Sequence, residues 1–227
     1  MQQATATIPI VSIGASDPVA IGLVKSLARP GGNITGVTNL TGELGPKQLE
    51  MLIAMTSTAT PKVTRVAVLL NPTSPSSAMR VQGIEAAAKT FGIHILPVEA
   101  QNPAQIDAAF AKMRQQNAGA LIVLLHSFFN QRSQQIAELA AKHRLPSMTS
   151  ASVYPESGCL MSYGTNLYEN FRRGAYFVDR IFKGTKPADL PFEQPTRFDL
   201  VNNGKTAKAL GLKIPQGLLI SADRVIE

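Results

Sequence analysis

The sequence predicts an α/β protein built from two lobes with doubly wound parallel sheets, the first of which is incomplete. Two observations lead to this prediction. Short apolar runs alternate along the chain with longer segments of helical periodicity, which is typical of βαβ units. In addition, residues 66–70 and 121–125 are entirely apolar, as expected for central parallel strands that are covered on both faces.

The first 61 residues contain two such units. The expected strands are residues 8–14 and 33–38, and the expected helices are residues 18–27 and 46–55. Asp17 is the expected N-cap of the first helix, with Pro18 at its first position. Two or three strands form a weak independent sheet, so we expect this lobe to be small or to lack residues before Met1.

Residues 62–164 predict a nearly complete doubly wound lobe. The expected strands are residues 65–70, 93–98, 120–125, 145–149 and 159–163, and the expected helices are residues 76–90, 103–116 and 130–143. We therefore expect residues 1–61 and 165–227 to form the incomplete amino-terminal-type lobe.

The carboxyl-terminal part is less regular. Its expected elements are a long helix over residues 167–182, a proline-bearing segment over 187–195, a strand over 197–201 and a helix over 204–210. Ser221 is the expected N-cap of a last helical turn.

The composition excludes several classes of protein. Hydrophobic residues make up 44% of the 227 residues and charged residues 16%, so the chain has enough apolar surface to fold. No apolar run reaches the ~18 residues of a membrane-spanning helix, and we expect no membrane insertion. The net charge is +7, but the basic residues are scattered and Trp is absent, so we expect no nucleic-acid partner.

The sequence also lacks the motifs of enzymes and metal proteins. Cys159 is the single cysteine, which excludes an internal disulfide and any Cys-x-x-Cys metal site. The phosphate-loop, dinucleotide, nucleophile-elbow and zinc-protease motifs are missing. We therefore expect no enzymatic activity, no catalytic residues, no cofactor and no metal. Residues 1–7 also lack the basic and apolar regions of a signal peptide.

The loops that follow the expected strands are rich in hydroxyls, amides and aromatic rings. Ligands of doubly wound sheets bind outside the carboxyl ends of the strands, and these groups suit a small polar organic molecule better than acid–base chemistry. The expected ligand-binding residues are Ser16, Asp17, Asn39, Asn71, Ser74, Ser76, Ser77, His126, Ser127 and Tyr154.

Structural roles remain open for several of these residues. Asp17 and the serines at 74, 76 and 77 also fit helix capping alone. His126 also fits a structural hydrogen bond, since a lone histidine after a buried strand is more often structural than catalytic. Tyr154 falls in an expected loop, where an exposed aromatic ring favours a ligand contact. Cys159 fits a small buried apolar residue.

Several stretches together resemble the substrate-binding proteins of bacterial ABC transporters, and within them the group that binds aromatic amino acids such as tryptophan or tyrosine. The stretches are Ile8-Pro-Ile-Val, Ser16-Asp-Pro-Val, residues 27–36 (LARPGGNITG), 65–72 (RVAVLLNP), 137–146 (AELAAKHRLP), 160–164 (LMSYG), 183–191 (KGTKPADLP) and 205–212 (KTAKALGL).

This resemblance implies a type I periplasmic-binding fold, in which two lobes close on a ligand in the cleft between them. It implies that the protein captures a small organic solute, such as an amino acid or a related molecule, and delivers it to an ABC permease in the periplasm. Family members usually begin with an export signal and further strands, so the resemblance also implies an amino-terminally truncated chain. By position, Asp17 would meet a ligand ammonium group and residues 71–77 a carboxylate.

A ligand-sensing or enzymatic protein on the same fold is the alternative. A DNA-binding regulator would need a headpiece, which the first 60 residues do not resemble. An enzyme would need a reactive constellation, for which only His126 and Asp17 are candidates. We also expect marginal stability, because an incomplete lobe leaves strand edges and apolar faces exposed.

Overall fold

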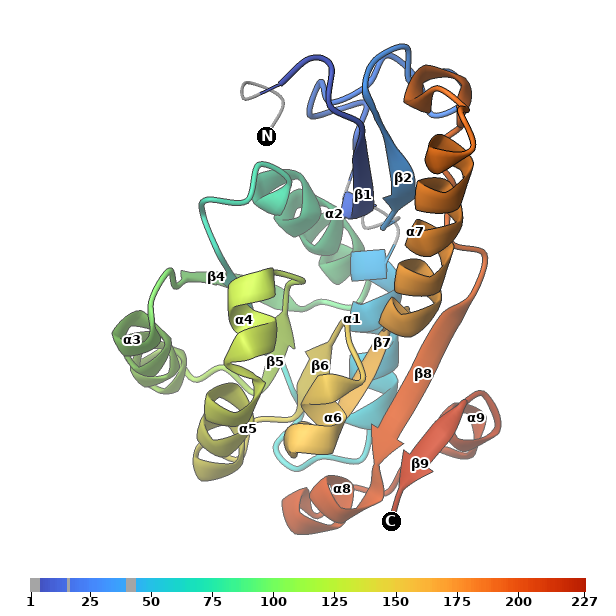
Figure 1. Cartoon of the computed structure of the whole chain (residues 1–227). Coiled ribbons are helices and arrows are strands. Elements are labelled where there is room, and N and C mark those ends of the chain that lie inside the picture. The colour runs from blue at the N-terminus through green and yellow to red at the C-terminus, as the bar shows by residue number, and fades with distance from the viewer. Residues whose placement is uncertain (1–4, 16, 40–43) are drawn as a thin grey trace. The chain divides into compact units, whose positions relative to one another are not determined.

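The computed structural model describes residues 5–15, 17–39 and 44–227 (Figure 1). The chain divides into two compact units: unit 1 is Met1–Thr41 with Thr165–Phe198, and unit 2 is Gly42–Gly164 with Asp199–Glu227. This division differs from the expected one because residues 42–61 and 199–227 belong to unit 2. Residues 44–55 form a helix on its core, and residues 198–203 and 224–226 add strands to its sheet.

Unit 2 is organised around a seven-stranded sheet with the order β4-β3-β5-β6-β7-β8-β9. β3 pairs with β4 on one side and with β5 on the other, and the pairs β5–β6, β6–β7 and β8–β9 are also parallel. The strands are β3 (Arg65–Leu70), β4 (His94–Glu99), β5 (Ala120–Val123), β6 (Ser147–Thr149), β7 (Met161–Thr165), β8 (Phe198–Asn203) and β9 (Arg224–Ile226).

The helices of unit 2 cover both faces of this sheet. α1 packs on α2, whereas α3 contacts α5 and α5 contacts α6, and right-handed crossovers place the two groups on opposite faces (Figure 1). The helices are α1 (Leu44–Met55), α2 (Ser77–Thr90), α3 (Pro103–Gln115), α4 (Ser127–Gln131), α5 (Ser133–Lys142), α6 (Val153–Ser157), α8 (Gly204–Leu210) and α9 (Gln216–Ile220).

Unit 1 contains the parallel pair β1 (Ile10–Ala15) and β2 (Ile34–Thr38), covered by α7 (Leu167–Phe182). The 3-10 helix η1 (Pro187–Asp189) lies against β2. β2 is buried along its whole length. α7 approaches β1 closely, because a Cβ added at Gly174 would lie 2.6 Å from Ile13 Cδ1.

The predicted helix over residues 18–27 is wrong. These residues form irregular turns, in which the Leu23 and Val24 amides both donate to the Pro18 carbonyl at 2.8 and 3.0 Å. Gly22 has a positive φ of 69°, which interrupts a right-handed helix. Val19 and Ile21 remain exposed, so the segment offers no continuous apolar face to the unit.

Three other expectations in unit 2 need correction. The predicted helix over 130–143 is two helices, α4 and α5, separated at Arg132. The loop expected after β6 contains the short helix α6. Ser221 follows α9 as its C-cap and does not begin a helical turn. Among the described helices, none combines the length and apolar character needed to cross a bilayer.

Candidate functional site

The order of strands in unit 2 places a topological switch point between β3 and β5. The chain runs from β3 to β4 on one side and then crosses to β5 on the other side of β3. Helices therefore leave the two neighbouring strand ends toward opposite faces, which opens a crevice at their carboxyl ends. The loops after residues 70 and 123 border this crevice, so we take it as the candidate site.

The loop after β3 is held by its own polar groups. Asn71 is buried, and its Oδ1 accepts hydrogen bonds from the Thr73 amide at 3.0 Å and the Thr73 hydroxyl at 2.7 Å. The Ser77 hydroxyl donates to the Asn71 carbonyl at 2.9 Å. The side chains of Asn71 and Ser77 therefore shape the loop, and their burial fixes its position at the strand end.

Two serines at the start of α2 make fewer hydrogen bonds within the loop than Asn71 and Ser77 do. The Oγ atoms of Ser74 and Ser76 lie 3.4 Å apart, and Ser76 is the N-cap of α2 without a side-chain capping bond. Its backbone has φ −88° and ψ −3°, which is helical and turns the hydroxyl away from the usual capping position. The Ser76 hydroxyl is thus available to hydrogen-bond another group. Ser76 is only 3% exposed, so that group would have to reach a buried position.

Arg80 is a candidate site residue that the sequence did not predict. It lies on α2, is 4% exposed, and donates from an Nη atom to the Leu125 carbonyl at 3.2 Å, directly across the switch point. Burial lowers the pKa of its guanidinium from its usual range to about 10, so it remains charged at neutral pH. No carboxylate among the described residues forms an ion pair with it. The spacing of Arg80 with Ser77, Ile84 and Ala88 on one helix face was the available indication.

The loop after β5 carries His126 and Ser127. His126 is the N-cap of α4, and its Nδ1 accepts a hydrogen bond from the Phe128 amide at 3.2 Å. Burial lowers the pKa of its imidazole below 6.5, in keeping with a neutral ring that accepts at Nδ1. Ser127 is exposed at the first position of the helix.

Tyr154 does not lie in an exposed loop. It belongs to α6, is 1% exposed, and its phenolic oxygen has no hydrogen-bond partner among the described residues. Burial raises the pKa of the phenol well above 10, so the ring is a neutral part of the core. Cys159 is fully buried, as expected.

Gln48 of α1 adds an amide near the ends of β6 and β7. Its Nε2 donates to the Tyr163 carbonyl at 2.7 Å and to the Ser150 hydroxyl at 3.0 Å. The side-chain oxygen of Gln48 is buried without a partner in the described part of the chain. This oxygen is therefore an acceptor that a polar ligand or water would satisfy.

The predicted residues of unit 1 have structural contacts. Ser16 lies outside the described residues, and Asp17 Oδ1 accepts from the amides of Val19 at 3.2 Å and Ala20 at 3.0 Å. Asn39 is buried: its Nδ2 donates to the Gly14 carbonyl at 3.2 Å. Its Oδ1 accepts from the Thr165 hydroxyl at 3.0 Å and from Asn170 Nδ2 at 3.2 Å. Asn39 thus joins β1 to α7.

Two pockets of unit 2 lie at opposite ends of its sheet. One of about 510 Å³ lies beside the start of α2 and is lined in part by Ser74, Ser77 and Glu99. The other, of about 700 Å³, is lined by residues that precede β3, β5 and β6, such as Thr64, Gly119 and Pro146. The second lies at the amino ends of the strands, away from the switch point. The first lies at the carboxyl ends of β3 and β4 and shares Ser74 and Ser77 with the switch-point loop, whereas Arg80 and His126 do not line it.

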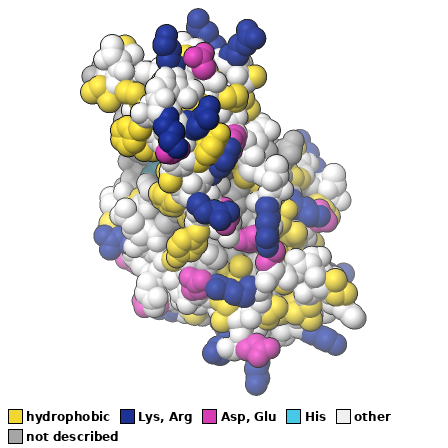
Figure 2. Space-filling model, turned by 45° about the vertical axis from the view of Figure 1, so that its right-hand side comes forward, with side chains coloured by type: hydrophobic (Ala, Val, Ile, Leu, Met, Phe, Trp, Pro, Cys, Tyr) yellow, Lys and Arg dark blue, Asp and Glu magenta, His cyan; other side chains and the backbone are white. Residues whose placement is uncertain are grey.

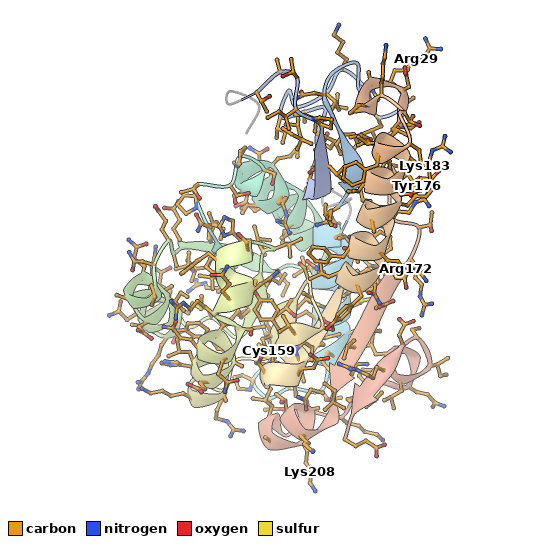
Figure 3. The ribbon with its side chains drawn as sticks, in the orientation of Figure 1. Arg29, Cys159, Arg172, Tyr176, Lys183 and Lys208 are labelled. Atoms are coloured by element: carbon orange, nitrogen blue, oxygen red, sulfur yellow. The ribbon has the colours of Figure 1, made fainter. Side chains whose placement is uncertain are left out.

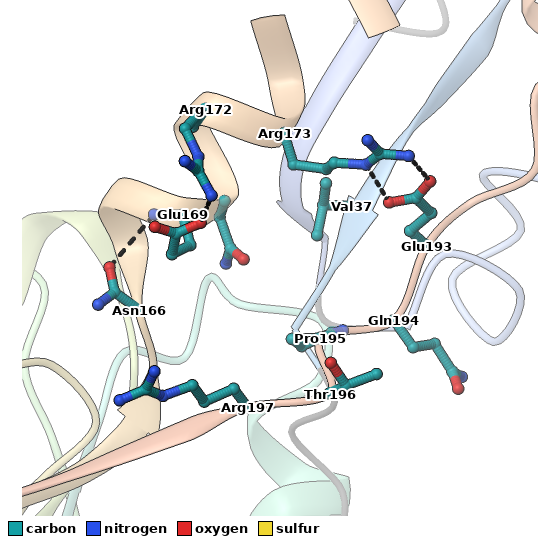
Figure 4. Close-up of a pocket in the computed structure, with 11 residues that line it drawn as sticks. Val37, Asn166, Glu169, Arg172, Arg173, Glu193, Gln194, Pro195, Thr196 and Arg197 are labelled. Atoms are coloured by element: carbon teal, nitrogen blue, oxygen red, sulfur yellow. Dashed lines mark hydrogen bonds and ion pairs between the residues drawn. The ribbon is translucent and has the colours of Figure 1, made fainter. Parts of the chain in front are cut away.

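Unit 1 has a charged pocket of about 460 Å³ between the start of α7 and residues 193–197 (Figure 4). Arg173 binds Glu193 through two hydrogen bonds of 2.5 Å and stacks on Tyr176, 3.8 Å from its ring centroid. Glu193 raises the pKa of the Arg173 guanidinium. The charges of this pocket are largely paired, which makes it a structural feature of the unit.

The switch-point groups suit binding rather than catalysis. Arg80 supplies a buried positive charge, Ser74 and Ser76 supply hydroxyls, and His126 supplies a neutral ring. The described residues contain no cluster of three His, Cys, Asp or Glu side chains that would hold a metal ion. A planar anion such as a carboxylate matches a guanidinium flanked by hydroxyl donors.

Comparison with known proteins identifies the family. The model of the ABC transporter substrate binding protein family matches residues 1–226, so the chain belongs to that family. Its fold is the type I periplasmic-binding fold with parallel sheets, as expected from the sequence.

Three relatives illustrate the similarity. The tyrosine-binding protein of Clostridioides difficile (strain R20291) is 22% identical over 222 residues, which are 98% of this chain and 61% of that protein. An ABC domain from Streptococcus pneumonia, solved in complex with L-Trp, is 26% identical with a TM-score of 0.89 and covers 99% of this chain and 74% of its own. A conserved domain protein of Vibrio cholerae is 26% identical with a TM-score of 0.88, covering 99% and 73%.

Proposed function

We propose that this chain is the solute-binding component of a bacterial ABC importer, and that unit 2 holds the carboxylate of an amino acid or a related small solute at its switch point. The single observation that carries this proposal is the buried Arg80, aimed at the Leu125 carbonyl between the ends of β3 and β5. The relatives named for tyrosine and solved with L-Trp support an amino-acid-like solute.

We also propose a partner for this chain and a compartment in which it acts. A substrate-binding protein releases its solute to a membrane permease, and we propose that this chain acts in the periplasm beside such a permease. It performs no chemistry on the solute. Asp17 remains a proposed contact for the solute's ammonium group, in line with a carboxylate whose Oδ1 caps the turn while its Oδ2 makes no hydrogen bond within the described part of the chain.

The test is a thermal-shift and calorimetric screen of amino acids, their decarboxylated amines, nucleosides and sugars against the purified chain. We expect stabilisation by a carboxylate-bearing solute, and a solute at one hundred times its Kd raises the free energy of unfolding by about 2.7 kcal/mol. The amine that lacks the carboxylate should give no shift. Turnover of the solute, or stabilisation by sugars alone, would overturn the proposal.

A further inference from the structure

The larger pocket of unit 2, at the amino ends of its strands, has a lining unlike that of the switch point. Its volume is about 700 Å³, which is within the range of sites for small molecules. We call it the amino-end pocket. Its described lining residues are 58–64, 117–119, Arg144, Pro146 and 210–212, all of them in unit 2.

The charges of the amino-end pocket are all positive. Lys62 and Arg144 are its charged lining residues, and no acidic residue is among those described. Both are exposed, and neither forms an ion pair in the described part of the chain. Figure 2, by contrast, shows Lys and Arg side chains spread over the visible face, several of them beside Asp or Glu. The pocket therefore offers its two cations to an anion.

Neutral hydrogen-bond donors line the same pocket. The hydroxyls of Thr58, Thr60 and Thr64 and the side-chain amide of Asn117 make no hydrogen bond to another described residue. The backbone amides of Thr60 and of residues 62–64 also donate to no acceptor within residues 5–15, 17–39 and 44–227. A phosphate group has several acceptor oxygens, so one such group can satisfy several of these donors at once.

The backbone of Arg144 supports a role for its charge. Its φ of 52° is left-handed, and it follows the C-cap of α5, whereas Asn117, with φ 54°, holds the equivalent place after α3. Glycine and asparagine are the usual residues at this position, because a larger side chain is strained there. Asn117 follows this rule and Arg144 does not. The chain thus keeps a cation beside the pocket despite backbone strain.

The helix ends near the amino-end pocket add to its positive potential. α3 carries Arg114 in its last turn and α5 carries Lys142. Burial lowers the pKa of His143, and the charges of Lys142 and Arg114 lower it further. Figure 3 labels Lys208, which lies in the last turn of α8 just before the lining residues 210–212. Anions are therefore attracted to this end of unit 2.

We propose that the amino-end pocket is a second binding site of this chain, and that it holds a phosphate group, either of a soluble molecule or of a lipid headgroup. Arg144 supplies a planar fork of donors and Lys62 a point charge. The threonine hydroxyls and the amides of residues 60 and 62–64 complete the contacts. The switch point lies at the carboxyl ends of the same strands, so the two sites are separate.

The first experiment titrates the full chain with sodium pyrophosphate at constant ionic strength, by calorimetry and by NMR. We expect saturable binding with a Kd of about 0.1–1 mM and shifts of the amide signals of residues 60–64 and 117–119. Low concentrations are needed because phosphate salts also stabilise proteins through exclusion from their surface. Shifts confined to residues 71–80 and 124–127 would place the anion at the switch point and overturn the proposal.

Charge-removing variants test the two cations. Arg144→Asn and Lys62→Gln should each weaken pyrophosphate binding about threefold to tenfold. Asn suits the left-handed backbone, so Arg144→Asn should also raise the melting temperature by about 1–3 °C. Arg132→Gln is the matched control: it removes an exposed cation at the opposite end of α5 and should leave the Kd unchanged. A higher melting temperature with unchanged affinity would show that Arg144 only ends the helix, which overturns the proposal.

Sedimentation with lipid vesicles distinguishes the two sources of phosphate. Vesicles of phosphatidylglycerol and phosphatidylcholine in equal parts are compared with vesicles of phosphatidylcholine alone. Co-sedimentation that requires phosphatidylglycerol and is reduced by Arg144→Asn and Lys62→Gln assigns the site to a headgroup. Pyrophosphate binding without co-sedimentation assigns it to a soluble phosphate compound. Absence of both kinds of binding overturns the proposal, as does equal pyrophosphate affinity in all the variants.

Discussion

Arg80 combines burial and charge in a way that few arginines do. Its guanidinium is 4% exposed, yet its single bond to a described residue goes to a neutral carbonyl, that of Leu125. A buried charge that has no counter-ion among the described residues costs free energy, which is consistent with the lowered pKa of about 10. A bound carboxylate would offset this cost, so solute binding and the stability of unit 2 should be linked through Arg80.

Replacing Arg80 by Met should therefore separate binding from folding. We expect a loss of affinity for a carboxylate-bearing solute of roughly tenfold to a hundredfold, the contribution of a charge-assisted hydrogen bond. Because Met fills a similar volume and leaves no carboxylate of the described residues unpaired, the melting temperature without solute should change little or rise. Calorimetry and a thermal melt measure the two effects. Arg114→Met, at an exposed position of α3, is the matched control.

The pKa of His126 predicts a loss of stability in acid. Burial lowers this pKa in the folded chain, so the unfolded chain binds the proton more readily. Stability should be unaffected above pH 6.5, fall as the pH drops below that value, and level off below the folded pKa. Protonation at Nδ1 also removes the acceptor for the Phe128 amide.

His126→Asn is the informative variant for this pH effect. Its Oδ1 reproduces the capping acceptor but does not titrate. Urea unfolding at pH 7.5 and 5.5 should show a smaller decrease for the variant than for the wild type. His143, whose pKa is lowered by burial and by Lys142 and Arg114, contributes equally to both. Equal decreases in the two proteins would contradict a role for His126.

At the scale of elements, the β1–β2 pair depends on a single glycine. Gly36 has φ 144°, and an added Cβ would lie 1.9 Å from the Ser12 carbonyl oxygen on the neighbouring strand. Gly36→Ala should therefore force the strands apart and destabilise unit 1 by about 3 kcal/mol or more. Gly32→Ala is the control, because its Cβ would meet nothing within 4 Å. Hydrogen exchange at Ile34–Thr38 measures the effect, and similar rates in both variants would contradict it.

The elements that the sequence predicted well are those with a strong apolar period. The strand at 65–70 has the expected bounds because its apolar run is buried from Val66 to Leu70, and the helices at 167–182 and 204–210 have them because Asn166 and Asn203 cap their starts and Gly184 and Gly211 follow their ends. The turn segment at 18–27 was mispredicted because its capping residues, Asp17 and Pro18, indicate a helix start, whereas Gly22 stops the helix before it completes two turns.

The candidate site was predicted in part. Topology places the loops after β3 and β5 at the switch point, so Ser74, Ser76 and His126 followed from strand positions alone. Tyr154 was misjudged because five residues are too few to show helical periodicity, and α6 buries its ring. Arg80 was missed because its spacing with Ile84 and Ala88 places it on the buried helix face, whereas its charge favours an exposed position.

For the whole molecule, the two units should differ in stability. The sheet of unit 1 has two described strands, whereas unit 2 has seven strands with helices on both faces. Native-state hydrogen exchange should therefore show roughly tenfold or faster opening in β1 and β2 than in β3 and β5. We also expect melting below about 65 °C for the monomer. Equal protection in the two units, or a single cooperative melt well above that temperature, would contradict this view.

Unit 1 is built from two segments that lie far apart in the sequence, so the ribosome makes the first segment well before the second. The Thr35 hydroxyl donates to the Leu190 carbonyl at 2.7 Å and the Thr38 amide to the Glu193 carbonyl at 2.8 Å. At ribosomal rates of about 5–20 residues per second, roughly 10–30 s separate the synthesis of β2 from that of these partners. The strand β2, which is buried in the folded unit, is therefore synthesised well before its partners on that side, while β3 to β7 emerge and begin to fold.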